Sequence, residues 1–130
     1  MIDLRAVSVV TMGAGVGGAL RFLVTQFFVG RFGVGDAFYA TLFINISGSF
    51  AIGLLLEIAQ TRANFDPLWR SFFSTGLLGG YTTFSTFSYE ALNLFSETLT
   101  MTAIFYVVAS VALGIIGCLA GISAARSLGH

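Results

Sequence analysis

The sequence predicts an all-α membrane protein with four transmembrane helices in one domain that covers residues 1–130. Hydrophobic residues make up 56% of the chain and charged residues 9%, and the mean hydropathy is +0.91, which is far from ordinary soluble usage. A helix needs about 20 residues to cross a hydrocarbon core. Charge-free runs of about that length or more lie at Ala37–Leu56, Ser71–Tyr89 and Thr98–Ala125, and a fourth apolar run, Ala6–Gly30, is interrupted only by Arg21.

We therefore expect transmembrane helices at about residues 6–30, 37–60, 69–93 and 99–125. The connections between them are short, so no soluble domain is left to carry separate chemistry, and we do not expect an enzyme. The formal net charge is zero, which argues against nucleic acid as a partner. Four short helices do not easily enclose a pathway, and the chain has no internal repeat, so we expect an oligomer.

Arginine is distributed unevenly between the two sides of this predicted bundle. An even number of spans puts both termini and the loop around Pro67 on the same side. Positive residues in short loops favour the cytoplasmic side of a membrane. The bias favours cytoplasmic termini, because Arg31 lies on the opposite side and the terminal side holds Arg5, Arg62, Arg70 and Arg126.

The first helix carries the string GAGVGG at Gly13–Gly18, which fits a dinucleotide-binding fingerprint in letters only. That fingerprint requires a preceding strand, and here the glycines lie inside an apolar span. Gly13, Gly17 and Arg21 follow one another at four-residue spacing, which predicts a face where another helix packs closely. Arg21 has two readings: it attracts anions into an aqueous vestibule, or it snorkels or is tied to a carbonyl group.

The second helix places Asn45 well inside its span. A polar side chain at that depth needs partners or water. The amide of asparagine offers two donors, which suits an anion, and one acceptor. The alternative is a hydrogen bond that holds two helices together, and that alternative is the commoner one for a single polar residue.

The third helix contains GGYTT at Gly79–Thr83, which predicts a break in the middle of the membrane. Paired glycines are flexible, and threonine side chains bond to nearby carbonyl groups. Broken helices in membranes expose carbonyl groups that coordinate Na⁺. The carbonyl groups of Gly79 and Thr82 are therefore candidate ligands of a cation.

After this break, Phe84, Phe87 and Glu90 advance by three residues along one helix face. A phenyl ring has a positive edge, so two rings that face a pore edge-on would attract an anion without a formal charge. Ordinary core packing explains the same spacing. On the fourth helix, Tyr106 and Ser110 share a face and are either pore lining or contacts between helices, whereas Gly114, Gly117 and Gly121 predict packing sites.

The chain resembles the Fluc (CrcB-like) fluoride channels over its whole length. The resemblance lies in GGxxR at Gly17–Arg21, TLxxN at Thr41–Asn45 and, most specifically, GxxGGxTTFSTF at Gly76–Phe87. It implies an antiparallel, dual-topology homodimer in the bacterial inner membrane, with lipid and fluoride as partners and two pores that conduct F⁻ passively to relieve fluoride toxicity. The arginine bias fits two-way insertion poorly.

The resemblance also implies roles for particular residues. It implies a structural Na⁺ at the dimer centre, held by the backbone carbonyl groups of Gly79 and Thr82. Phe84 and Phe87 would be the pore rings, Asn45 the pore amide and Arg21 a vestibule arginine. A polar track near the pore would contain Thr41, Glu90, Tyr106 and Ser110.

Two other functions compete with a fluoride channel. A small multidrug exporter also has four spans and dual topology, but it couples proton entry to cation expulsion and needs a carboxylate deep in the membrane. The best candidate for that carboxylate, Glu90, lies just beyond the end of its charge-free run. In a membrane assembly subunit that transports nothing, the polar residues would only hold helices together.

Overall fold

The computed structural model describes residues 3–62 and 64–128, and the regular elements of these segments are all helical. The element η1 is a single 3₁₀ turn, and η2 is a π-helix. In chain order the elements are α1 (Leu4–Phe32), η1 (Val34–Asp36), α2 (Phe38–Thr61), α3 (Pro67–Ser71), η2 (Phe72–Leu78), α4 (Gly79–Tyr81), α5 (Phe84–Ser96) and α6 (Thr100–Leu128).

Helices long and apolar enough to cross a membrane lie at Leu4–Phe32, Val34–Thr61 and Thr100–Leu128. The prediction of an all-α protein with membrane-length apolar helices is thus confirmed. The segment predicted as a span at residues 69–93 is divided among α3, η2, α4 and α5. The longest of these, α5, has 13 residues, which is too short to cross a membrane alone.

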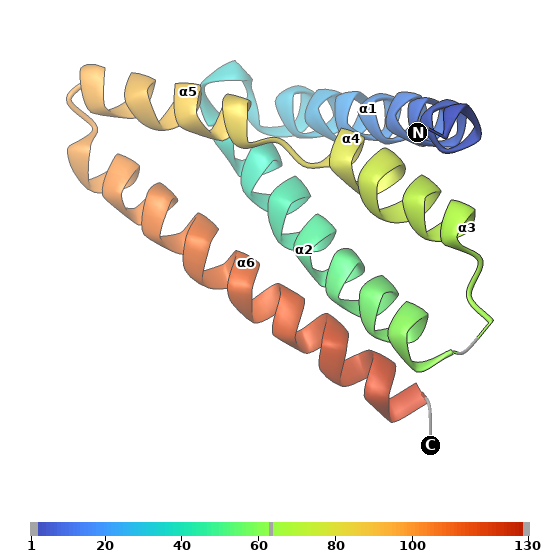
Figure 1. Ribbon diagram of the computed structural model, residues 1–130. Coiled ribbons are helices and arrows are strands. Elements are labelled where there is room, and N and C mark those ends of the chain that lie inside the picture. The colour runs from blue at the N-terminus through green and yellow to red at the C-terminus, as the bar shows by residue number, and fades with distance from the viewer. Residues whose placement is uncertain (1–2, 63, 129–130) are drawn as a thin grey trace.

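The helices run back and forth along one axis (Figure 1). α2 and α6 lie side by side and point in the same direction, and they form the most extensive helix pair. α1 packs along η2 and α4, while α5 packs against α6 and α2. The start of α1, the end of α6, the end of α2 and the start of α3 lie at the same end of the bundle (Figure 1).

Glycine allows α2 and α6 to approach each other closely. A Cβ atom on Gly53 of α2 would collide with the carbonyl group of Cys118, and one on Gly121 of α6 would collide with that of Phe50. Gly117 is also tight, because its Cβ would lie 3.1 Å from the carbonyl oxygen of Ile46. These contacts confirm that Gly117 and Gly121 are packing sites, in keeping with the enrichment of small residues between membrane helices.

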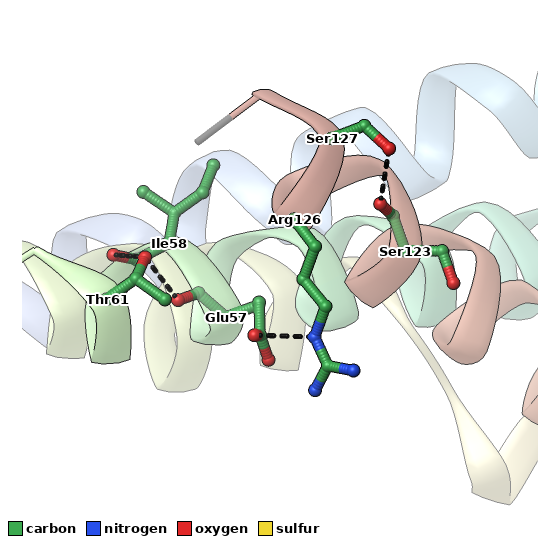
Figure 2. A network of polar contacts seen from close by, with 6 residues as sticks. All are labelled: Glu57, Ile58, Thr61, Ser123, Arg126 and Ser127. Atoms are coloured by element: carbon green, nitrogen blue, oxygen red, sulfur yellow. Dashed lines mark hydrogen bonds and ion pairs between the residues drawn. The ribbon is translucent and has the colours of Figure 1, made fainter. Parts of the chain in front are cut away.

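An ion pair connects the C-terminal ends of α2 and α6 (Figure 2). Arg126 Nε lies 2.9 Å from Glu57 Oε1, with side-chain exposures of 67% and 16%. Neighbouring hydroxyl groups turn back to their own helices, since Thr61 donates to the carbonyl of Glu57 and Ser127 to that of Ser123 (Figure 2). Solvent screens a pair with such an exposed arginine, so the pair fixes the helix ends only weakly.

The turn between α5 and α6 contains a residue in the left-handed conformation. Thr98 has φ 62°, while the N–H of Leu99 donates to the carbonyl of Leu94 at 3.0 Å and so closes the end of α5. Glycine is the usual residue at this position of a helix end. A β-branched side chain there is strained.

We expect Thr98→Gly to stabilise the protein by roughly 1 kcal/mol, because relief of left-handed strain exceeds the added entropy of glycine in the unfolded chain. The measurement is the midpoint of thermal unfolding in detergent. Thr98→Ala is the matched control, since alanine keeps a Cβ atom in the same conformation and should gain much less. Equal midpoints for Thr98→Gly and the wild type would contradict this account.

Candidate functional site

The backbone leaves the helical conformation between α4 and α5. Thr82 has φ −78° and ψ 159°, and Thr83 has φ −151° and ψ 118°. Both residues are extended, so the N–H and carbonyl groups around them lose part of their helical partners. The interruption lies within the GGYTTF string. Tyr81 ends α4, and Phe84 begins α5.

Side chains from two other helices bond to the extended residues. Asn45 of α2 accepts from the N–H of Thr83 at 2.9 Å and donates through Nδ2 to the carbonyl of Thr83 at 3.0 Å. Arg21 of α1 donates through Nη1 to the carbonyl of Thr82 at 3.3 Å and is half-buried. Asn45 therefore connects two elements, and Arg21 is tied to a carbonyl group.

The glycines of α1 bring Arg21 to this position. A Cβ atom on Gly17 would collide with the carbonyl of Leu77 and lie 2.8 Å from the backbone nitrogen of Tyr81. A Cβ atom on Gly13 would lie 2.9 Å from the backbone nitrogen of Leu77. The backbones of α1 and of η2–α4 are thus in contact. Arg21 lies four residues after Gly17 in α1, and its guanidinium group reaches the carbonyl group of Thr82.

A cleft of about 330 Å³ lies beside the interruption. Its lining carries amide, hydroxyl, backbone and aromatic groups, and no lining residue is charged. It gathers six of the residues singled out from the sequence: Asn45, Gly79, Thr82, Phe84, Phe87 and Ser110. Thr83, Ser49 and Ser74 add further polar groups to the same lining.

Ser110 projects a buried hydroxyl group from α6 into this set. Its Oγ has no hydrogen-bond partner anywhere in residues 3–62 and 64–128. A buried hydroxyl group without a partner costs about 1–3 kcal/mol. Because Ser110 lines the cleft, a ligand bound there would accept a hydrogen bond from this hydroxyl group.

The aromatic rings form a chain from the cleft into the core. The rings of Phe84 and Phe87 have centroids 5.6 Å apart, and Phe87 is 5.3 Å from Tyr106. Tyr106 packs edge-on against Phe38 at 5.4 Å and is 1% exposed. Phe84, by contrast, is 78% exposed. Phe87 therefore belongs to both the core and the cleft, and Phe84 is uncovered in a single chain.

Glu90 lies at the far side of this aromatic chain. Its Oε1 accepts from Thr41 at 3.0 Å and its Oε2 accepts from Tyr106 at 2.7 Å. Glu90 does not line the first cleft but a second one of about 280 Å³, together with Asn93 of α5 and Glu97, which follows the end of α5. The three predicted polar residues Thr41, Glu90 and Tyr106 are thus one hydrogen-bonded group.

Thr83 is a residue of this site that the sequence analysis did not assign a role. It is 8% exposed, and its Oγ1 caps α5 by accepting from the N–H of Thr86 at 3.3 Å. The signal was present, because a threonine before a helix with a polar residue three positions later is typical of an N-cap. The hydrogen-bond partner of its backbone, Asn45, lies 38 residues earlier in the chain, and local sequence patterns do not predict such a contact.

A protein-family model described as "CrcB-like protein, Camphor Resistance (CrcB)" matches residues 8–122. The chain belongs to the CrcB-like family. Among its relatives, a protein of Rhizobium meliloti is 41% identical over 96% of this chain and 99% of its own length. A protein of Methylobacterium nodulans is 45% identical over 93% and 96%, and one of Roseiflexus is 40% identical over 92% and 95%. Each of these three is named a fluoride-specific ion channel FluC.

Membership of the CrcB-like family agrees with the resemblance in Gly76–Phe87. The match runs through all the residues that build the cleft and the group around Glu90. Together with the three long apolar helices, it identifies the chain as a multi-pass protein of the bacterial inner membrane.

Proposed function

We propose that this protein is a fluoride-selective channel that lets F⁻ leave the cell passively and so relieves fluoride toxicity. The observation that carries the proposal is the uncharged cleft beside Thr82 and Thr83, where the unpaired hydroxyl of Ser110 and the rings of Phe84 and Phe87 meet. The names of the family members given above support the same ion.

The chemistry of the cleft suits a small, strongly hydrated anion. Moving an isolated ion into a low-dielectric interior costs tens of kcal/mol, so the lining must replace water with several donors. Ser110 supplies a hydroxyl proton, and the ring edges of Phe84 and Phe87 supply positive electrostatic potential. No fixed positive charge lines the cleft, so binding stays weak enough for release.

The proposed path continues from Phe87 past Tyr106 to Glu90 and the second cleft. Thr41 and Tyr106 donate hydrogen bonds to Glu90. These hydroxyl groups can donate to a passing anion only when their hydrogen bonds to Glu90 break. Arg21 stands at the edge of the interruption and would raise the local anion concentration in a vestibule. These roles follow the family motif and agree with the contacts of each side chain.

For the assembly, we propose four spans per chain, with the third broken in the middle of the membrane, in an antiparallel homodimer of dual topology. The third span would consist of α3, η2, α4 and α5. The exposure of Phe84, at 78%, supports a second copy that completes the wall of the cleft. The arginine bias argues against equal insertion in both directions, so we expect the two orientations in unequal amounts.

A structural Na⁺ at the dimer centre is part of the same proposal, and the residues fit it in part. In a continuous helix the carbonyl of Gly79 would accept from the N–H of Thr83. That N–H donates to Asn45 instead, so the carbonyl of Gly79 lacks this helical partner. The carbonyl of Thr82 accepts from Arg21 and has one lone pair left. Na⁺ would be held by the carbonyl oxygens of Gly79 and Thr82, and a second copy would have to supply further oxygen ligands.

The geometry disfavours a proton-coupled exporter. Such a protein needs a carboxylate that is free to take protons in its substrate cleft. Both oxygens of Glu90 accept hydrogen bonds, and Glu90 is absent from the lining of the first cleft within the part of the chain that the structure describes.

Efflux from proteoliposomes tests the proposed function. Liposomes that contain the purified protein and are loaded with F⁻ should release it rapidly when a potassium ionophore balances the charge, and the rate should not need a pH gradient. Liposomes loaded with Cl⁻ are the control and should release almost none. Cation transport driven by protons would favour the exporter, and a folded dimer that releases no F⁻ would favour the assembly subunit.

A further inference from the structure

The side-chain amide of Asn45 makes most of its hydrogen bonds to the protein backbone. Its oxygen accepts from the N–H of Thr83 and its nitrogen donates to the carbonyl of Thr83, at 2.9 and 3.0 Å. The side chain thus gives Thr83 both of the hydrogen bonds that a neighbouring backbone would give. Thr83 is buried, and buried backbone groups without partners are costly, so these two bonds hold the extended conformation.

Thr83 in turn fixes the start of α5. It is the N-cap of that helix, and its Oγ1 accepts from the N–H of Thr86 at 3.3 Å and donates to Thr86 Oγ1 at 3.1 Å. Phe84 is the first residue of α5, and Phe87 follows within the first turn. The orientation of Thr83 therefore sets the direction in which both rings leave the backbone.

We infer that Asn45 is a positioning residue, which acts through the backbone of Thr83 to hold the rings of Phe84 and Phe87 at the cleft. This differs from a role as the main amide donor to the anion, because only one N–H of Asn45 remains for a ligand. Ser110 of α6 has the opposite arrangement, since its buried hydroxyl group has no hydrogen-bond partner in the described segments. The effect on ion flux rests on the proposed function, whereas the effect on Thr83 does not.

The contrast between Asn45 and Ser110 gives a direct test by hydrogen–deuterium exchange with amide resolution. In Asn45→Ala, the N–H of Thr83 loses its acceptor, and its exchange should become about tenfold faster, as expected for loss of one or two hydrogen bonds. Ser110→Ala is the matched control, because Ser110 lines the same cleft without a bond to Thr83. Exchange at Thr83 should stay at the wild-type rate in Ser110→Ala, and F⁻ efflux should fall in both variants.

A second variant keeps the test decisive if Asn45→Ala does not fold. Asn45→Asp has nearly the same shape, and as a carboxylate it keeps an acceptor for the N–H of Thr83 but has no donor for the carbonyl. Its exchange rate at Thr83 should lie between those of the wild type and Asn45→Ala. Wild-type exchange in both Asn45 variants, with F⁻ efflux lost, would overturn the inference and show that Asn45 acts on the ion directly.

Failure of the proposed function would look different. In that case the wild-type protein would release no F⁻, while the Thr83 amide would still exchange faster in Asn45→Ala than in Ser110→Ala. The positioning of Thr83 and the identity of the transported ion are thus measured separately.

Discussion

Phe87→Ala is expected to abolish F⁻ efflux, and Phe84→Ala to reduce it by about tenfold or more, since an aromatic contact is worth about 0.5–1.5 kcal/mol beyond its buried area and each 1.4 kcal/mol is tenfold. Phe87 has the larger effect because it lines the cleft and also packs against Tyr106. Phe84 lines the cleft, contacts the ring of Phe87 and is mostly exposed. The measurement is the initial rate of F⁻ efflux from proteoliposomes of equal protein content.

Two further variants test whether the effect on efflux requires an aromatic ring and whether it requires a position at the cleft. Phe87→Leu keeps an apolar side chain in the core but removes the aromatic edge, so efflux should remain strongly reduced. Phe27→Ala removes an exposed ring of α1 that lines neither of the two clefts, and its efflux should match the wild type. Wild-type efflux in Phe87→Leu would refute the ring-edge role and leave Phe87 as a packing residue.

The free energy of unfolding should separate the two phenylalanines in the same order as the efflux rate. Phe87 packs against the buried cluster that contains Phe38 and Tyr106, so Phe87→Ala carries the usual cost of about 3–5 kcal/mol for a buried phenylalanine, reduced by its partial exposure. Phe84 has little to lose within one chain. A fall in the unfolding midpoint for Phe84→Ala as large as that for Phe87→Ala would indicate that a second copy covers Phe84.

The sequence predicted the long helices well because their signal is local. The ends of α1, α2 and α6 lie within a few residues of the apolar runs, since charge and the Asp3 cap at the start of α1 are short-range features. The three-residue spacing predicted that Phe84 and Phe87 share a helix face, and both rings line the first cleft. It also grouped Glu90 with them, whereas Glu90 lines the second cleft and accepts hydrogen bonds from Thr41 and Tyr106.

Contacts between distant segments could not be predicted in the same way. The π-helix at Phe72–Leu78 depends on the backbone of α1 that packs against Gly76 and Leu77. The bonds from Asn45 to Thr83 and from Arg21 to Thr82 join residues 38 and 61 positions apart. For both polar residues the sequence left a functional and a structural reading open, and only the partner atoms distinguish them.

Gly17→Ala is expected to prevent stable folding, and this follows from the same contact between backbones. The added Cβ atom would collide with the carbonyl of Leu77 and lie 2.8 Å from the backbone nitrogen of Tyr81. Neither atom belongs to a side chain that can rotate away, so α1 must move as a whole. We expect destabilisation of at least about 3 kcal/mol, at the upper end of overpacking, measured as the unfolding midpoint and the monodisperse yield in detergent.

The adjacent glycine is the matched control. A Cβ atom on Gly18 meets nothing within 4 Å, and alanine is favoured over glycine inside a helix by roughly 0.5–1 kcal/mol, so Gly18→Ala should be neutral or slightly stabilising. Equal behaviour of the two variants would contradict the close approach of α1 to α4. Because Arg21 reaches the carbonyl of Thr82 only along that approach, any Gly17→Ala protein that does fold should release F⁻ more slowly than Gly18→Ala. The glycine face of α1 thus supports the interruption between α4 and α5 from one side as Asn45 of α2 supports it from the other.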